Sequence, residues 1–353
     1  MAYRNPKVSV CMPNYNFGHF IGQAIQSVLE QTFADFELII VDDASTDNSV
    51  AIIKSFSDER VKFYQNEKNI GRVKNINKCL SLASGEYVTI LPSDDIYLPA
   101  SLQRRVQVLD SEPGVGLVYS SAGTIDEDGT VVKEHHTWTQ NYVLSGEDEF
   151  KRLIFGNYIP VLTVLVRREC YATLGLFNEA VTGSADSEMW LRICLNDYHV
   201  GFVAEVIAYD REHAGDVSSY FSQTNLSGMN TYRVVKTVFS SLPSGKEHLS
   251  YLEPQVVKAL ARRMLARAAV NLTRERSSLA RKNVGLAIAI DDGLLKDWRT
   301  HALFLATLFG WCLAPAKKLL PGFAKRAIRQ AGRKVLARGK PGRNVLTSSD
   351  LRN

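Results

Sequence analysis

The chain has 353 residues, of which 45% are hydrophobic and 22% are charged. A chain of this length is too long for one ordinary hydrophobic core, so we expect one large domain with an appendage, or two domains. The composition is typical of a soluble globular protein and excludes a disordered, a collagen-like or a polytopic membrane protein.

Charge is distributed unevenly along the chain, although the net charge is only +5. Residues 299–353 contain twelve Lys and Arg and one acidic residue, Asp350. Residues 1–298 contain thirty basic and thirty-six acidic residues. A basic end on a mildly acidic body indicates contact with an anionic surface, either a membrane or a nucleic acid.

The cysteines and the apolar segments bear on the compartment. The five cysteines are scattered without a C-x-x-C pair, which predicts buried thiols and a reducing, cytoplasmic compartment. The first residues lack the charged and apolar pattern of a signal peptide. The longest apolar run, 302–314, is shorter than the about 20 residues that a spanning helix needs.

Apolar runs and helical spacings alternate along the first hundred residues. The patterns predict buried strands over 7–12, 36–41, 61–64 and 87–91, and helices over 19–31, over about ten residues after Asp47, and over 72–83. Such alternation indicates βαβ units and a mostly parallel sheet, in which ligands bind beyond the carboxyl ends of the strands. Those ends carry 13–16, 42–43 and 93–95, so we expect a site there.

The pattern changes after residue 100. Strands are predicted over 115–120, 161–166 and 200–208, with a hairpin-type turn at 126–129 and a helix over 186–196. From about residue 225 the chain is predicted to be helical, over 228–240, 249–273 and 278–290.

Two acidic pairs follow predicted strands. Asp42-Asp43 is suited to accept hydrogen bonds from a nucleotide base or ribose, whereas capping of the next helix by Ser45 or Asp47 is the alternative interpretation. No G-x-G-x-x-G follows the first strand, which disfavours ordinary dinucleotide binding. Asp94-Asp95 suits a divalent cation, with helix capping as the alternative.

Several segments occur in a characteristic order and spacing. They are Val8–Asn16, Gln31–Phe33, Phe36–Asp47, Asn69–Asn77, Ala83–Val88, Ser93–Asp95, Arg167-Arg168, Leu174–Asn178, Ala185–Arg192 and Tyr209–His213. Taken together, they resemble family 2 glycosyltransferases of the GT-A fold over residues 5–220. The resemblance implies an α/β fold with a Rossmann-like mixed sheet flanked by helices and followed by a C-terminal helical extension. We expect a glycosyltransferase domain over 1–224, a helical region over 225–298 and a basic tail over 299–353.

The resemblance also implies how a nucleotide sugar would bind. Pro13, Tyr15 and Asp43 would hold the nucleotide base, and Arg72 or Lys74 would approach the diphosphate. A glycine and two cations at a helix start suit a phosphate, whereas a solvated basic helix face is the alternative for Arg72 and Lys74.

The remaining roles concern the metal and the reaction. Asp94 and Asp95 would hold Mn²⁺ or Mg²⁺ and contact the nucleotide ribose, with His213 as a further metal or diphosphate contact. Asp186 would be the general base. The alternatives are a helix N-cap for Asp186 and a loop histidine for His213, and Trp190 is expected in the core rather than at the acceptor.

Two positions depart from the family pattern. The first acid of the usual Asp-x-Asp-Asp motif is Pro92, and the usual Glu before the catalytic Asp is Ala185. We expect inverting transfer of a sugar from a nucleotide donor, a UDP-sugar above all, to a saccharide or lipid-linked saccharide, in O-antigen, capsule or exopolysaccharide synthesis. The alternative is a catalytically degenerate domain that holds nucleotide or glycan as a membrane scaffold.

The basic tail suggests where such an enzyme would work. Residues 323–338 show an apolar face and a basic face, and Trp298 and Trp311 flank the apolar run. This pattern predicts helices that lie on an anionic membrane, peripheral to the inner face of the plasma membrane. Packing on the catalytic domain or across a homodimer is the alternative, and nucleic-acid binding is not expected because no such motif is present.

Overall fold

The computed structural model describes residues 5–213 and 226–308. The chain divides into two compact units. The first contains Met1–Leu153, Asn157–Gln223 and Lys236–Ser250, and the second contains Ile154–Gly156, Thr224–Val235 and Tyr251–Asn353. The domain boundaries expected at 224 and 298 stay predictions.

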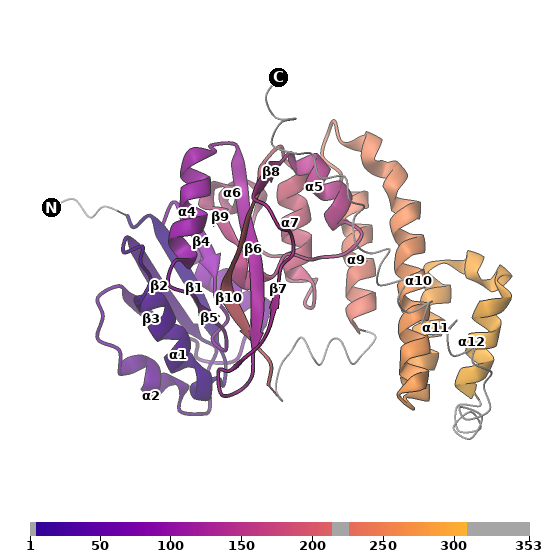
Figure 1. Ribbon diagram of the computed structural model, residues 1–353, viewed down its shortest axis with the longest axis horizontal. Helices are drawn as coiled ribbons and strands as arrows, with labels where there is room; N and C mark the ends of the chain where they lie inside the picture. Colours follow the sequence, from indigo (N-terminus) through magenta and orange to yellow (C-terminus); the bar gives the residue numbers. More distant parts are fainter. Residues whose placement is uncertain (1–4, 214–225, 309–353) are drawn as a thin grey trace. The chain divides into compact units, whose positions relative to one another are not determined.

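A mixed sheet forms the centre of the first unit, and within the described residues it has ten strands (Figure 1). Its main path runs β3-β2-β1-β4-β9-β6-β10-β5. The strands are β1 (Val8–Asn14), β2 (Phe36–Asp42), β3 (Val61–Gln65), β4 (Tyr87–Ile90), β5 (Ile96–Tyr97), β6 (Val115–Ile125), β7 (Val131–His135), β8 (Tyr142–Leu144), β9 (Leu165–Arg167) and β10 (His199–Arg211). The first four are mutually parallel, as predicted, whereas β9 runs antiparallel between β4 and β6.

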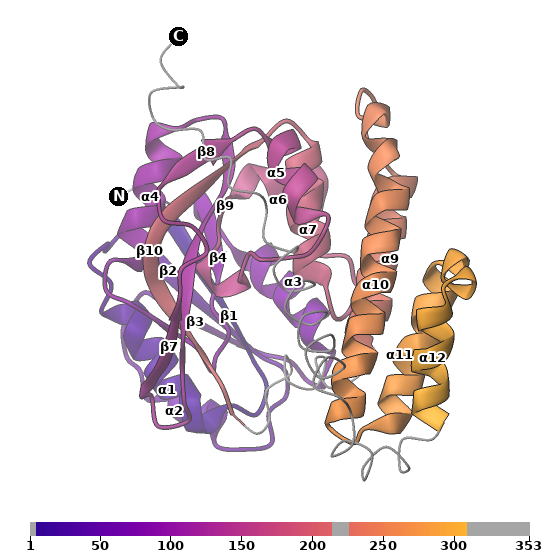
Figure 2. The same cartoon turned by 45° about the vertical axis from the view of Figure 1, so that its right-hand side comes forward.

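Helices cover both faces of this sheet (Figure 2). One face carries α1 (Gly18–Leu29), α2 (Ser49–Lys54) and α4 (Ser101–Ser111), and the other carries α3 (Arg72–Leu82), α5 (Gly146–Leu153), α6 (Arg168–Leu174) and α7 (Ala185–Leu195). Successive side chains of β1 point to opposite faces of the sheet. Val8, Val10 and Met12 join the apolar cluster under α1, whereas Cys11 faces Cys79 of α3. The expected α/β fold is confirmed.

Local details differ from the predicted elements. The helix after Asp47 has six residues instead of ten, because its last turn closes at Ser55, whose hydroxyl donates to the Ile52 carbonyl. The apolar run 161–166 is not one strand. Pro160 starts a single 3-10 turn over Val161–Thr163, and the strand begins only at Leu165.

Helices α9 (Leu226–Ser240), α10 (Leu252–Thr273) and α11 (Ser277–Ile290) confirm the helices predicted after residue 225, and α12 (Trp298–Leu308) follows them. The division between the units falls within α9. In the second unit Leu260, Ala261 and Met264 of α10 pack with Ala287 and Ile290 of α11. None of the helices in the described part of the chain is long and apolar enough to cross a membrane. The predicted helix over 323–338 and the second part of the apolar run, residues 309–314, lie outside the described residues.

Candidate active site

The carboxyl ends of β1, β2 and β4 meet at one edge of the sheet because the strands are parallel and Asn14 pairs with Asp42. Asp42 is fully buried, and its carboxylate accepts hydrogen bonds from the side-chain amide of Asn14, 2.8 Å away, and from the backbone N–H of Ser45, 2.9 Å away. Asp42 thereby joins the last residue of β1 to the loop after β2. Tyr15, at the tip of the first loop, is exposed, and Pro13 is half-buried.

Asp47 connects the segments that follow β1 and β2. Its carboxylate accepts from the backbone N–H of Gly18 at 2.8 Å and of Ser49 at 3.0 Å, at the first residues of α1 and α2. Burial alone would raise the pKa of Asp47, but these bonds outweigh it and lower that pKa. A Cβ at Gly18 would lie 2.0 Å from the Asn48 side chain and 2.9 Å from the Asp47 carboxylate, so a larger residue there would displace these side chains.

Asp43 is also buried, and it organises the loop after β3. Its carboxylate accepts from the Asn66 side-chain amide at 2.8 Å and from the backbone N–H groups of Ile70 and Gly71, both at 2.9 Å. Gly71 has φ +90°, a conformation that favours glycine. Because a carboxylate has about four acceptor positions, three bonds leave one for a nucleotide base, and that contact stays a prediction.

Asp94 and His213 lie together although 119 residues separate them. The Nε2 atom of His213 is 3.1 Å from Oδ2 of Asp94, and the rings of Phe17 and Phe20 enclose the imidazole, with centroids at 5.6 and 4.9 Å. Carboxylate oxygen and imidazole nitrogen fit a divalent cation such as Mn²⁺. Within residues 5–213 and 226–308, no group of three or more His, Cys, Asp or Glu side chains is arranged to hold a metal.

Asp95 is buried and binds the backbone at the end of β10. Its Oδ1 accepts from the backbone N–H of Arg211 at 2.9 Å. Burial, followed by the charges of Asp94 and Asp210, holds the pKa of Asp95 well above its usual range. The Arg211 side chain donates to the carbonyl of Asp94 and to the Gln23 side chain. Arg211 therefore fixes the acidic segment against α1.

Asp186 lies in the first turn of α7. The side-chain amide of Asn157 donates to its Oδ2 at 2.9 Å. Burial raises the pKa of Asp186, while the Ser187 N–H, the charge of Arg72 and the Asn157 amide pull it part of the way down. A carboxylate with a raised pKa is a stronger base than an ordinary aspartate.

The two cations predicted to meet a diphosphate lie on different sides of α3. The charge of Arg72 acts on the pKa values of both Asp95 and Asp186, so its guanidinium lies within electrostatic reach of both carboxylates. Lys74 is exposed and lies two residues further on, and residues two apart on a helix do not face the same direction. The contact of Arg72 or Lys74 with a diphosphate stays a prediction.

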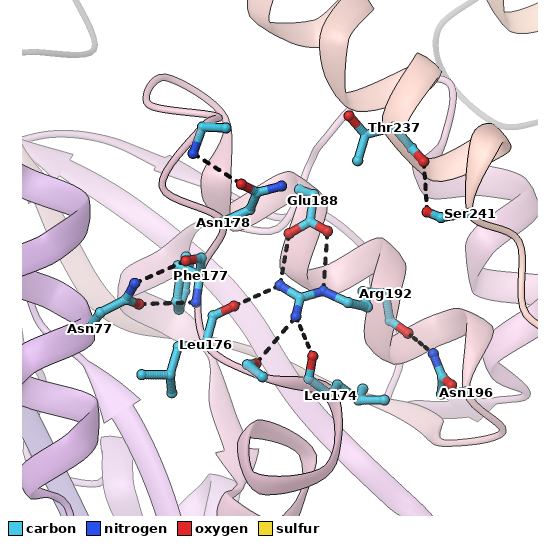
Figure 3. A network of polar contacts seen from close by, with 12 residues as sticks. Asn77, Leu174, Leu176, Phe177, Asn178, Glu188, Arg192, Asn196, Thr237 and Ser241 are labelled. Carbon is cyan, nitrogen blue, oxygen red and sulfur yellow. Dashed lines mark hydrogen bonds and ion pairs between the residues drawn. The ribbon is translucent and has the colours of Figure 1, made fainter.

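The start of α7 is held by a polar network (Figure 3). Arg192 forms a two-pronged ion pair with Glu188 and donates to the carbonyls of Leu174 and Leu176. Asn77 of α3 exchanges two hydrogen bonds with the backbone of Phe177. Trp190 is buried among these residues, as predicted. The network fixes the loop that leads into the turn containing Asp186.

The sequence-predicted residues all belong to the first unit. Asp94 is beside His213, and Arg72 is within reach of Asp95 and Asp186. Sequence reasoning missed Asn157, because an isolated asparagine outside any motif carries no signal.

Comparison with known proteins identifies the family. The model for glycosyl transferase family 2 matches residues 9–170. The chain is 31% identical over 196 residues to WfgD of Escherichia coli, named a UDP-Glc:α-D-GlcNAc-diphosphoundecaprenol β-1,3-glucosyltransferase, covering 56% of this chain and 72% of WfgD. The chain belongs to family 2 of the glycosyltransferases. It is an enzyme, and further relatives named for teichuronic acid and chondroitin synthesis place its glycosyl transfer in polysaccharide biosynthesis.

Solved structures confirm the GT-A fold. Residues 1–349 of Staphylococcus aureus TarS, in complex with UDP-GlcNAc, align with a TM-score of 0.61 and 18% identity over 97% of this chain and 95% of that one. The mannosyltransferase PcManGT from Pyrobaculum calidifontis, in complex with GDP-Man and Mn²⁺, aligns with a TM-score of 0.55 and 16% identity over 96% and 88%. The alternative of a degenerate scaffold domain is not favoured.

Proposed function

We propose that this glycosyltransferase transfers a sugar with inversion of configuration, with Asp186 as the general base. The observation that carries the proposal is the pairing of a half-buried, raised-pKa carboxylate with the charge of Arg72, on the unit that also holds Asp94 and His213. The acceptor hydroxyl passes its proton to Asp186 and its oxygen bonds to the sugar C1 on one face. The bond from C1 to the nucleotide phosphate breaks on the opposite face, which inverts the configuration.

The leaving diphosphate needs positive charge. Arg72, at the first position of α3, would contact its oxygens. Asp94 and His213 would hold a Mn²⁺ or Mg²⁺ ion, and Asp95 would keep Asp94 in place through Arg211. When bound, such an ion supplies Lewis-acid neutralisation of the leaving group.

The nucleotide would lie along the loops after β1, β2 and β3. Tyr15 is exposed at the tip of the first loop, Pro13 is half-buried behind it, and Asp43 retains one acceptor position for a base N–H. We favour a UDP-sugar, which is consistent with the donor in the name of WfgD and with the ligand of TarS. Asp95 is buried behind this surface, so Asp94 would make the direct contact with nucleotide or ion.

We favour an acceptor saccharide carried on a lipid diphosphate, as in the name of WfgD. Contact with an anionic membrane surface, at the inner face of the plasma membrane, would bring the enzyme to such an acceptor. Within the described residues, Trp298 at the start of α12 is 72% exposed and Leu305 is 52% exposed, which suits an interfacial helix. Pairing of two copies through the same apolar surface is the competing role for α12.

The test is turnover of UDP-sugars by the purified full chain with a lipid-linked acceptor. Asp186→Asn keeps the size of the side chain and one acceptor oxygen but removes the base, so we expect transfer to fall by at least about a hundredfold. Binding of UDP in the presence of Mn²⁺ should remain. EDTA should stop turnover in the unaltered enzyme. Near-normal turnover by Asp186→Asn would rule out the assignment of the base.

A further inference from the structure

Two arginines of α10 are largely withdrawn from water without an acidic partner. Arg263 and Arg267 are one helical turn apart, and both belong to the second unit together with Phe155 and Gly156. Burial lowers the pKa of both guanidinium groups, and the charge of Arg267 lowers that of Arg263 further. No carboxylate in the described part of the chain forms a salt bridge with either residue.

The first of these guanidinium groups is held in a fixed position. The Nη2 atom of Arg263 donates to the carbonyl of Phe155. Its Nη1 atom lies against Gly156, where an added Cβ would be only 2.8 Å away. The Nη1 atom of Arg267 is buried and has no hydrogen-bond partner among the described residues. The pair therefore presents a fixed donor and an unsatisfied donor on one side of a helix.

Such an arrangement is unfavourable in the absence of a ligand. Like charges four residues apart on a helix repel each other, and the buried Nη1 atom of Arg267 loses hydration that no described residue replaces. Exposed arginines on the same helix, such as Arg262, do not carry this cost. A bound anion would remove both penalties, and phosphate oxygens match the planar guanidinium groups through paired hydrogen bonds.

We propose that Arg263 and Arg267 form a binding site for a diphosphate group, which is the diphosphate of a lipid-linked acceptor. Two guanidinium groups one turn apart, about 6 Å along the helix surface, suit two linked phosphates better than a single carboxylate. The identity of the ligand rests on the proposed function, whereas the existence of an anion site rests on the arginine pair alone.

Binding to the full-length protein tests this site. In EDTA, which weakens metal-dependent binding of nucleotide to the first unit, inorganic pyrophosphate and farnesyl diphosphate are titrated calorimetrically and by thermal shift. We expect both to bind to the unaltered protein and to raise its melting temperature. Arg263→Gln and Arg267→Gln should each weaken binding about tenfold or more. Arg262→Gln, an exposed neighbour on α10, is the matched control and should bind normally.

The unliganded variants provide a second measurement. Since Arg267→Gln removes a charge without a counter-ion, its melting temperature without ligand should equal or exceed that of the unaltered protein. A clear fall would mean that Arg267 has a structural partner and would overturn the proposal. Equal pyrophosphate affinity in Arg267→Gln and Arg262→Gln would also overturn it.

The two probes separate the possible sources of the anion. Displacement of pyrophosphate by farnesyl diphosphate supports a lipid-linked ligand, whereas binding of pyrophosphate alone overturns that part of the proposal. Because neither probe requires turnover, the binding result stands even if Asp186→Asn proves active and the proposed base is wrong.

Discussion

Replacing Asn157 with alanine removes the amide that donates to the carboxylate of Asp186 from 2.9 Å. A donor facing a carboxylate stabilises its charged form, so this bond lowers the pKa of Asp186 against the upward effect of burial. Without the amide the pKa of Asp186 rises, and the base becomes protonated at a higher pH. The acid limb of the pH profile should therefore move upward, with the largest loss of rate at low pH.

The size of the shift follows from the strength of the bond. A hydrogen bond to a charged group is worth about 1.5–3 kcal/mol, and about 1.4 kcal/mol corresponds to one pKa unit. Because Asp186 is only partly buried, water replaces part of the lost bond. The lower end of the range applies, which gives a rise of about one unit.

The measurement is kcat/KM for donor and acceptor between pH 5 and pH 9. Asn178→Ala is the control, since the Asn178 side chain accepts from the Ala180 N–H in the loop before α7 and does not contact Asp186. That variant should leave the limb in place. If Asn157→Ala lowers kcat/KM by the same factor at every pH and the acid limb of the profile stays where it is, Asn157 has only a structural role and the reasoning is refuted.

Two further predictions concern stability and location. Arg192→Ala leaves the buried Glu188 carboxylate without its ion pair, so the free energy of unfolding should fall by about 3 kcal/mol in denaturant titrations. Arg192→Lys should recover part of this loss, and equal stability of the unaltered protein and both variants would contradict the prediction. Truncation after Asp297 should abolish co-sedimentation with anionic liposomes, and undiminished sedimentation of the truncated chain would contradict the membrane role of the tail.

The sheet edge was largely predictable from the sequence. Runs of buried apolar residues, such as the one that ends at Asp42, have the length and period of parallel strands, and the carboxyl ends of such strands must meet. Other elements gave no such signal. Strand β5 has only two residues, Ile96 and Tyr97, and pairs with β10 through contacts that no local pattern encodes.

The side-chain partners in the site were less predictable. The spacing suggested that Asp43 is a ligand, but it contained nothing about the two backbone N–H groups after β3 that Asp43 accepts. The bond from Asn157 to Asp186 is similar, because it depends on how two loops meet. Periodicity reports which way a strand or helix faces, and it does not report the pairing of polar groups across loops.

The carboxylate of Asp47 places a negative charge at the start of α1. In many nucleotide-binding proteins with parallel sheets, the start of the first helix receives the pyrophosphate. Here that position is filled from within, since Asp47 accepts from Gly18 at the beginning of α1. An incoming diphosphate would meet a resident negative charge at α1 and would be repelled from it. Asp43 places a second carboxylate at Ile70 and Gly71, just before α3, so under the proposed function the positive charge of Arg72 and of a cation at Asp94 and His213 would offset both.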